Sequence, residues 1–370
     1  MTTLWLSERR DRDTGAVGTW ALCLATVLIA PIAVVSLSLF QSDNGTIAHL
    51  ARTVLWDYVA NSLLLTLGVA IGVLVIGTVT AWLVVMCRFP GARLFEWMLI
   101  LPLAFPAYIL AYAYTDLLSH PGFVQSTLRD LTGWGPRDYW FPQIRSLGGA
   151  TMMFIFVLYP YVYLLARSAF LEQSASYTDA SRSLGRSPLA TFFLVTLPLA
   201  RPAIVGGAAL ALMETLADYG TVAHFSVQTF TTGIYRAWYS LDDLIAASQL
   251  ATMLLAMVLL LVLFERAERR RSRFQNAQTD RVNRPFHLKG WHGVAAFTAC
   301  LVPVAIGFFI PVITLVHLHF VDGHDLFSRR YVDLIQNTVT IAGIAAGCTV
   351  VLGLAVAYAQ RIENGWSTAT

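Results

Sequence analysis

The chain has 370 residues, of which 56% are hydrophobic and only 13% are charged, and its formal net charge is +3. A water-soluble protein of this length needs more charge to cover its surface, so the composition excludes a soluble chain and indicates an integral membrane protein. The four cysteines lie in or beside apolar segments and form no CxxC pair, so we expect neither a disulfide framework nor a zinc site.

Eight apolar stretches predict eight transmembrane helices, because backbone groups at membrane depth must be satisfied within the chain. The stretches cover residues 17–40, 58–87, 97–115, 146–166, 202–225, 244–264, 293–320 and 334–360. The first is too long for a signal-peptide core and has no small-residue cleavage site at its end, so we interpret it as a retained helix. The predicted fold is therefore an all-α, polytopic bundle.

The distribution of positive charge predicts the orientation. If the N-terminus is cytoplasmic, 18 of the 25 Lys and Arg residues fall inside the cell, and the opposite orientation inverts this bias. The cytoplasm then receives the tail 1–16, the loop 177–198 and the basic stretch 265–289. The arginines of 265–289 lie beside a membrane span, where they anchor the inner side, so no nucleic-acid partner is expected.

The loop at 177–198, YTDASRSLGRSPLATFFLVTLP, predicts two short helices joined by a turn. One helix is expected from Tyr177 to Leu184 and the other from Pro188 to Leu197. Gly185 can adopt the left-handed conformation that ends the first helix. Ser187 and Pro188 are typical of a helix start, with a cap followed by a proline in the first turn.

The spacing of this loop resembles the EAA motif of binding-protein-dependent ABC importer permeases, which reads E-A-A, three residues, G, nine residues, I, one residue, L-P. The identical positions are Ala180, Gly185, Leu197 and Pro198. The conservative departures are Asp179 for Glu, Ser181 for the second Ala and Val195 for Ile. The resemblance implies that the first short helix is a coupling helix, which sits in a groove of a cytoplasmic ATPase subunit. The alternative is an ordinary amphipathic cytoplasmic loop.

The chain also repeats part of itself at an offset of 276 residues. The shared pairs are Asn61 with Asn337, Ala70 with Ala346, Val75 with Val351, Gly77 with Gly353 and Ala81 with Ala357. Such similarity is expected when a transporter builds its pathway between two related bundles. We therefore predict a first permease half at 17–264 with six spans, a linker at 265–289, and a second half at 290–370 with two. A complete second half would extend to roughly residue 540, so the second copy is expected to be truncated.

Three further segments resemble the fused, two-half permeases of ferric-iron importers. They are LPLAFPAYILAYAYTDLL at 101–118, LYPYVYLLARSAF at 158–170 and ETLADYGTVAHFSVQTFTTGIYRAW at 214–238. The resemblance implies an inner-membrane permease that receives substrate from a periplasmic binding protein and works with a pair of ATPase subunits. Related permeases for thiamine, sulfate, phosphonate or polyamine share this architecture and remain alternatives.

Two acids in the fifth predicted span are candidate pathway residues. Glu214 and Asp218 are four residues apart, which places them on one face of a helix, and Tyr219 follows directly. A carboxylate at membrane depth is costly and usually faces a cavity or a partner, so the pair would favour a cation. In the alternative interpretation the acids lie near the outer end of the span and cap a bend with Gly220.

The sequence contains no phosphate-binding GxxxxGK[ST] loop, no HExxH and no GxSxG, so we expect a transporter subunit that is not an enzyme and holds no cofactor or metal. The outer stretch HLHFVDGHD at 317–325 has imidazoles and carboxylates at a spacing suited to a transition metal, but a solvated loop at a helix end explains it without one. The main rival function is an ion- or proton-coupled secondary carrier, which also uses repeats and membrane carboxylates. A membrane scaffold without transport is a third reading.

Overall fold

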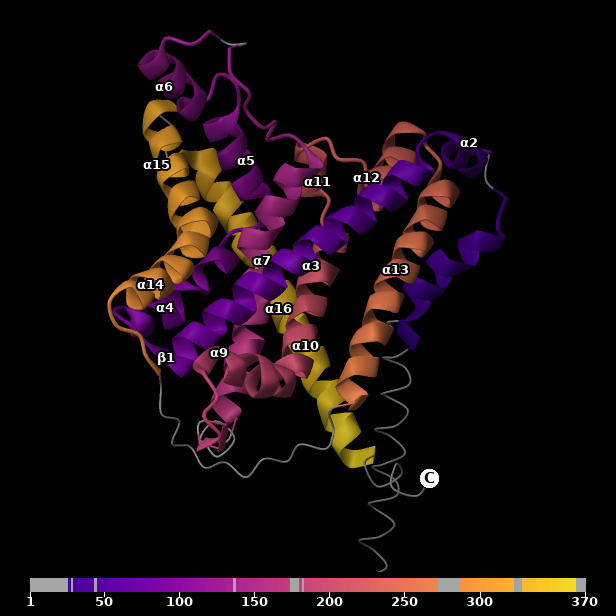
Figure 1. The fold of residues 1–370 in the computed structure, drawn as a ribbon. Helices are drawn as coiled ribbons and strands as arrows, with labels where there is room; N and C mark the ends of the chain where they lie inside the picture. The colour runs from indigo at the N-terminus through magenta and orange to yellow at the C-terminus, as the bar shows by residue number, and fades with distance from the viewer. Residues whose placement is uncertain are drawn as a thin grey trace, which may run out of the picture. The chain divides into compact units, whose positions relative to one another are not determined.

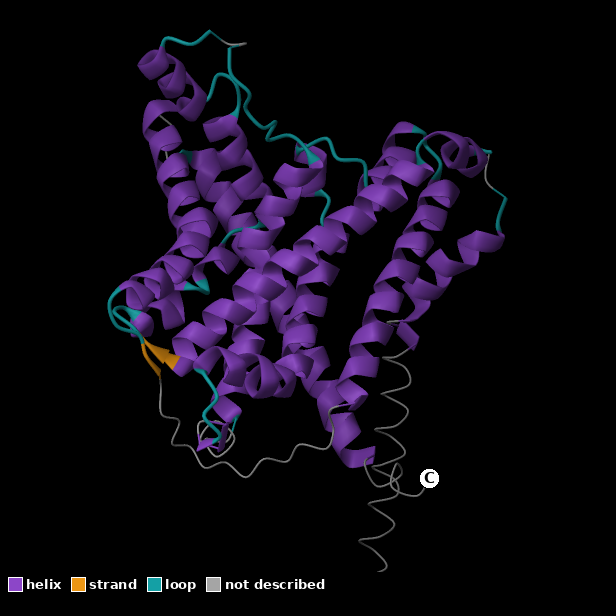
Figure 2. Cartoon of the chain, in the orientation of Figure 1, coloured by secondary structure: helices purple, strands orange, loops and turns teal. Residues whose placement is uncertain are grey.

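The computed structural model describes residues 26–27, 29–42, 45–135, 138–173, 180–181, 183–271, 286–322 and 328–363. These residues are almost entirely helical (Figure 2). They form two compact units: Gln41–Leu318, and the described parts of Met1–Phe40 with His319–Thr370.

The long helices are α3 (Leu55–Met86), α7 (Leu147–Glu172), α10 (Leu197–Ala217), α13 (Leu244–Arg271), α14 (Trp291–Val304), α15 (Ile310–Asp322) and α16 (Arg329–Glu363). The shorter helices are α2 (Thr46–Thr53), α4 (Ala92–Met98), α5 (Ala107–Leu118), α6 (Phe123–Thr132), α9 (Pro188–Thr191), α11 (Gly220–His224) and α12 (Phe230–Tyr235). Six helical segments of the described chain are long and apolar enough to span a membrane, and seven if a bent pair counts as one span. This confirms an all-α, polytopic fold, with a count below the predicted eight.

Helix α7 is the centre of the larger unit, where its main contacts are with α3 and α10 (Figure 1). Small residues allow the close approach. A Cβ at Gly77 of α3 would lie 2.6 Å from the Val162 side chain, and one at Gly207 of α10 would lie 2.7 Å from the Val162 Cα atom. Small residues let helix backbones approach each other where lipid supplies no hydrophobic driving force. The buried core therefore forms around α7.

The third predicted span, 97–115, is not one straight helix, and the prediction was wrong in this respect. The chain forms α4, a 3₁₀ turn at Leu101–Ala104 and then α5, and the segments on either side of the break differ in direction by 88°. Pro102 lies in the turn and Pro106 precedes α5. Proline removes a backbone donor and clashes with the preceding turn, which accounts for the bend.

The predicted helix 188–197 and the predicted span 202–225 are also corrected. Residues Leu189–Ala217 form one membrane-length segment that passes from α9 through a π-helical turn at Phe192–Thr196 into α10. The π turn lies directly before Pro198, whose missing N–H cannot enter an unbroken α-helical ladder. The span then ends at Ala217, because Asp218 adopts an extended conformation with ψ of 133°.

Helix α14 and the π-helical turn that follows it (Ala305–Phe309) pack onto α3, α4, α7 and the 3₁₀ turn at Leu101–Ala104. Strand β1 (Cys87–Arg88) pairs in parallel with β2 (Phe286–His287). The Tyr114 hydroxyl donates to the Ile306 carbonyl at 2.8 Å, and the rings of Phe95 and Phe297 meet at 5.2 Å. Tertiary contacts thus join residues on both sides of the predicted linker 265–289.

The first and last predicted spans lie in the smaller unit. Ile29–Phe40 is a shorter apolar helix, and the residues 17–25 of that predicted span lie outside the described residues. Helix α16 matches the last predicted span. Adding the repeat offset of 276 residues to the two ends of α3 gives Tyr331 and Ile362. These positions lie within two residues of the two ends of α16. The two segments related by the repeat therefore form helices of nearly equal length.

Candidate functional site

The turn at Gly185, within the loop 177–198, has the left-handed geometry that the sequence predicts. Gly185 has a φ of +73°, in the left-handed region that residues with a Cβ rarely adopt. The Leu184 N–H donates to the Ala180 carbonyl at 3.1 Å, and the Arg186 N–H donates to the Ser181 carbonyl at 3.2 Å. These bonds close the last helical turn before the chain reverses.

The second helix starts at the predicted cap. The Ser187 hydroxyl accepts the Ala190 N–H at 3.2 Å, and Pro188 is the first residue of α9. A buried hydrogen bond then joins the two arms of the turn: the hydroxyl oxygens of Ser181 and Thr191 are 2.9 Å apart. Thr191 is a site residue that the sequence analysis missed, because only the fold brings it opposite Ser181.

The loop is also attached to the membrane helices on both sides. The Gln173 side-chain amide donates to the Thr196 carbonyl at 2.9 Å, which ties the residue after α7 to the start of α10. The rings of Trp82 on α3 and Phe192 pack at 5.1 Å. The segment after the turn is therefore in contact with α3 and with the residue that follows α7.

The far side of the turn is open. Leu184 is 80% exposed and Leu189 is 62% exposed, with the exposed Arg186 between them. Two exposed leucines flanking an arginine are a suitable docking surface for another protein. Asp179 lies outside the described residues. Val195, Leu197 and Pro198 belong to the continuous segment into α10, where they connect the turn to the span.

At the other end of α10, the two candidate pathway acids keep the helical spacing, because the Asp218 N–H donates to the Glu214 carbonyl at 3.1 Å and Asp218 has a φ of −69°. Glu214 is in the last turn of α10 and is exposed, whereas Asp218 follows the end of the helix. Asp218 accepts the Thr221 N–H through its carboxylate at 2.8 Å, and its carbonyl accepts the Thr231 hydroxyl at 2.8 Å. Asp218 therefore caps α11 at the bend, as the alternative interpretation described. Glu214 remains the acid with an open side chain.

Tyr219 belongs to a stack of aromatic rings that the sequence analysis did not identify. Its ring lies 3.9 Å from that of Tyr235, which lies 5.7 Å from that of Tyr239, and both pairs are stacked. The spacing of Tyr235 and Tyr239 places them on the same side of a helix, which was the available signal. The stack lines a cavity of about 490 Å³ together with Arg236. None of the described residues that line this cavity is acidic.

The described residues thus define a multi-pass helical membrane protein with an exposed turn at Gly185 shortly before the span Leu189–Ala217. The sequence profile of the binding-protein-dependent transport system inner membrane component matches residues 74–273, more than half of the chain. The chain belongs to this family of ABC importer permeases and is a multi-pass inner-membrane protein with the type I permease fold.

The relatives of this chain are named for different substrates: ferric iron, molybdenum and sulfate. The chain is 27% identical to the Fe(3+)-transport system permease protein FbpB 2 of Haemophilus influenzae over 82% of its own length and 56% of that relative. It is 30% identical to the molybdenum permease ModB of Escherichia coli over 45% of this chain and 70% of ModB. It is 27% identical to the sulfate permease CysT of Salmonella typhimurium over 67% of this chain and 89% of CysT.

A solved structure supports the fold alone. A bacterial ABC transporter that imports the acidic polysaccharide alginate matches with a TM-score of 0.57 at 15% identity. The match covers 73% of this chain and 99% of that one. The arrangement of helices is therefore shared, while the low identity carries no information on the substrate.

Proposed function

We propose that this chain is the permease subunit of an ATP-binding cassette importer, which passes substrate from a periplasmic binding protein into the cytoplasm. The observation that carries the proposal is the exposed turn at Gly185, whose two arms are joined by the Ser181–Thr191 bond, while the Gln173–Thr196 bond joins the residue after α7 to the residue before α10. Energy comes from a separate pair of ATPase subunits, since the chain has no phosphate-binding loop of its own.

The proposed mechanism uses the turn as a lever. Closure of the ATPase pair on ATP draws the turn sideways, with Leu184 and Leu189 as the apolar contact. The Ser181–Thr191 bond keeps the two arms of the turn together, and the Gln173–Thr196 bond transmits the movement to α7 and α10. The helices then move as packed bodies between an outward-open and an inward-open state.

The orientation belongs to the same proposal. A cytoplasmic N-terminus places the turn on the side of the ATPases, in agreement with the arginine bias. The binding protein then docks on the opposite face, where α6 and residues 138–146 form a long aromatic connection between α5 and α7.

Substitution of Gly185 tests the coupling role. Gly185→Val forces a β-branched residue into a positive φ and should distort the turn, so we expect loss of co-purifying ATPase and of ATP-driven uptake. Gly133→Val is the matched control, because Gly133 has a φ of +70°, has equally open surroundings and lies beyond α6. Retention of the ATPase by Gly185→Val, or equal loss of co-purifying ATPase in both variants, would contradict the assignment.

We propose ferric iron as the substrate. The support is the likeness to FbpB 2, which extends over 82% of this chain, together with the exposed carboxylate of Glu214, which favours a cation. Glu214→Gln with Asp218→Asn should then lower uptake of radioactive iron without loss of the ATPase. Unchanged iron uptake in that double variant would remove the acids from the pathway.

An oxyanion is the second candidate substrate. The cavity beside the tyrosine stack presents Arg236 and hydroxyl groups, which are donors suited to an anion such as sulfate or molybdate, and CysT and ModB are relatives. Uptake of labelled iron, sulfate and molybdate should be compared in Glu214→Gln and Arg236→Gln. Loss of anion uptake in Arg236→Gln alone would favour the oxyanion over iron.

Reconstitution separates the importer from the rival secondary carrier. The purified chain in liposomes should transport nothing without its ATPase. Transport driven by an ion gradient alone would refute the importer and support a carrier.

A further inference from the structure

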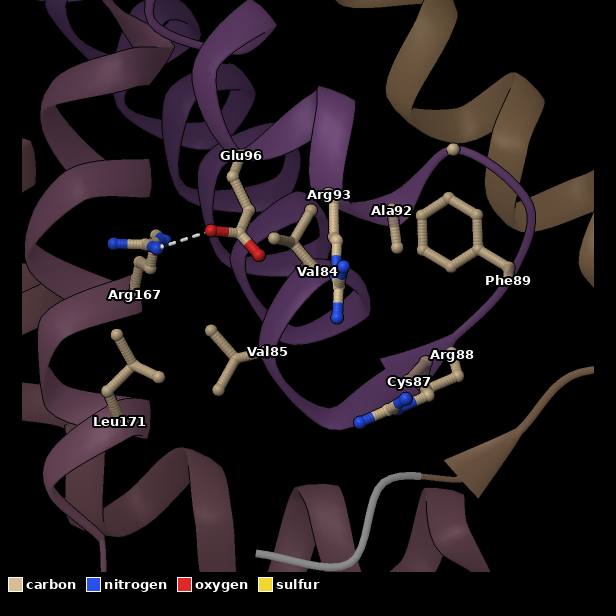
Figure 3. A pocket seen from close by; sticks show the side chains of 11 residues that line it. Val84, Val85, Cys87, Arg88, Phe89, Ala92, Arg93, Glu96, Arg167 and Leu171 are labelled. Atoms are coloured by element: carbon tan, nitrogen blue, oxygen red, sulfur yellow. Dashed lines mark hydrogen bonds and ion pairs between the residues drawn. The ribbon is translucent and has the colours of Figure 1, made fainter.

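An arginine-lined pocket lies where α3 ends, α4 begins and α7 ends (Figure 3). Its volume is about 480 Å³, far larger than a single phosphate group. The residues that matter for its chemistry are Val84, Val85, Arg88, Arg93, Glu96 and Arg167. None of them belongs to the turn at Gly185 or to the candidate pathway, so the proposed function leaves this pocket without a role.

The pocket carries an excess of positive charge. Its three arginines come from three different elements, and Glu96 is the only acid among the described lining residues. Glu96 is already engaged, because it pairs with Arg167 at 2.9 Å. Among the described residues, neither Arg88 nor Arg93 has an ion-paired carboxylate. Two guanidinium groups therefore remain available for an anion.

Two further features concern the backbone of Arg88 and the side chain of Arg167. The backbone of Arg88 is fixed by the β1–β2 pairing, and its carbonyl accepts the Leu288 N–H at 3.0 Å. The Nε atom of Arg167 is buried and has no hydrogen-bond partner within the described part of the chain. A buried donor without a partner is costly, and an anionic oxygen in the pocket is a partner of the right kind.

Part of the pocket lining is apolar. Val84 and Val85 form it on α3, and Leu171 of α7, which is 52% exposed, continues it outward. Helix α3 has 32 residues, about 48 Å at 1.5 Å per residue, whereas the hydrocarbon core of a bilayer is about 30 Å thick. The end of α3 can therefore lie at the depth of lipid headgroups.

We propose that this pocket binds the phosphate group of an anionic phospholipid. Arg88 and Arg93 bind the phosphate oxygens, and the wall of Val84, Val85 and Leu171 packs against the glycerol and the first acyl carbons. By the arginine bias, the pocket faces the cytoplasmic leaflet, where anionic lipid attracts basic residues. Free phosphate has no apolar part to fill this wall, and a carboxylate of an ATPase subunit would leave it uncovered. The site does not depend on the identity of the transported substrate.

Lipid titration of the purified full chain, followed by native mass spectrometry, tests the site. Phosphatidylglycerol should bind more tightly than phosphatidylcholine. Arg88→Gln with Arg93→Gln should weaken phosphatidylglycerol binding about 25-fold, at about fivefold for each arginine. Arg88→Lys with Arg93→Lys should retain most of the binding, which excludes misfolding as the cause. The matched control is Arg329→Gln with Arg330→Gln, two exposed arginines at the start of α16, which should change binding less than about twofold.

Three outcomes would overturn the proposal. The first is equal phosphatidylglycerol binding by the wild type and the double glutamine variant. The second is full displacement of the lipid by excess inorganic phosphate, which would make the pocket a free-phosphate site. The third is absence of lipid preference combined with loss of the ATPase from the double glutamine variant, which would assign the arginines to a protein carboxylate.

Discussion

Helices α3 and α16 are related by the internal repeat, yet their surroundings in this chain differ completely. The most apolar window of α3 is 50% buried inside the structure, and that of α16 is 0% buried. The difference is largest at Gly77 and Gly353, which occupy the same position in the two copies of the repeat. A Cβ at Gly77 would meet Val162 and the backbone of Tyr159, whereas a Cβ at Gly353 would meet nothing within 4 Å.

The comparison separates helix formation from helix packing. Apolar residues in a low-dielectric environment form a helix because each backbone group must find a partner within the segment, and both stretches meet this condition. Packing needs a second surface of complementary shape. Helix α3 has that surface in α7, which lies in the same compact unit, whereas the described residues of the smaller unit leave the apolar window of α16 unburied.

The largest expected difference is between Gly77→Val and Gly353→Val. The new side chain at Gly77 would collide with the backbone of α7, so we expect a loss of about 3 kcal/mol in the free energy of unfolding. Gly353→Val should change it by less than about 0.5 kcal/mol, because the position is open. Thermal unfolding of both variants in one detergent measures the difference, and equal melting temperatures would contradict the packing of α3 on α7.

A second pair enlarges a side chain without any change at glycine. Ala81 is 0% exposed in the core around α7, so Ala81→Leu should cost about 2 kcal/mol through overpacking. Ala357 is its exposed counterpart on α16, and Ala357→Leu should be close to neutral. The same unfolding measurement applies, and a neutral Ala81→Leu would show that this part of the core is loose.

A third pair tests a polar contact. The Asn61 side-chain amide donates to the Gln228 carbonyl at 2.9 Å, so Asn61→Leu should cost about 1 kcal/mol. No hydrogen bond of the Asn337 side chain is found within the described chain, and Asn337→Leu should be neutral or slightly stabilising in detergent. Hydrogen exchange at residues 226–232 is the more sensitive readout, because it should increase only in Asn61→Leu.

The smallest effect is expected where the two helices are alike. Val75 is 58% exposed and Val351 is 66% exposed. Replacing either with alanine should change the free energy of unfolding by less than about 0.5 kcal/mol. A large loss at Val351 alone would reveal that α16 packs against a partner in the purified chain, which would weaken the comparison.

The loop at 177–198 shows which structural features can be predicted from neighbouring residues alone. The left-handed Gly185 and the Ser187 cap follow from properties of single residues, so the sequence analysis found them. The same analysis separated a helix at 188–197 from a span at 202–225, whereas the structure joins them in one segment, Leu189–Ala217. A π turn at Phe192–Thr196 allows the chain to pass through as one span, and no local pattern announces such a turn.

The candidate pathway residues show which features cannot be predicted from neighbouring residues. Glu214 and Asp218 were identified by charge within an apolar stretch, but their relative placement depends on where α10 ends. The partners of Asp218, Thr221 and Thr231, come from the segment that folds back after the bend. The stack of Tyr219 on Tyr235 likewise joins residues of two separate short elements.

The sequence by itself determined the membrane class, most of the spans, the family and the turn at Gly185, because hydropathy, charge bias and glycine conformation act over a few neighbouring residues. Only the tertiary structure decided which helix faces are buried, where the broken spans bend, and that Arg88, Arg93 and Arg167 share one pocket. These features depend on contacts between residues far apart in the chain, and no short-range pattern specifies such contacts.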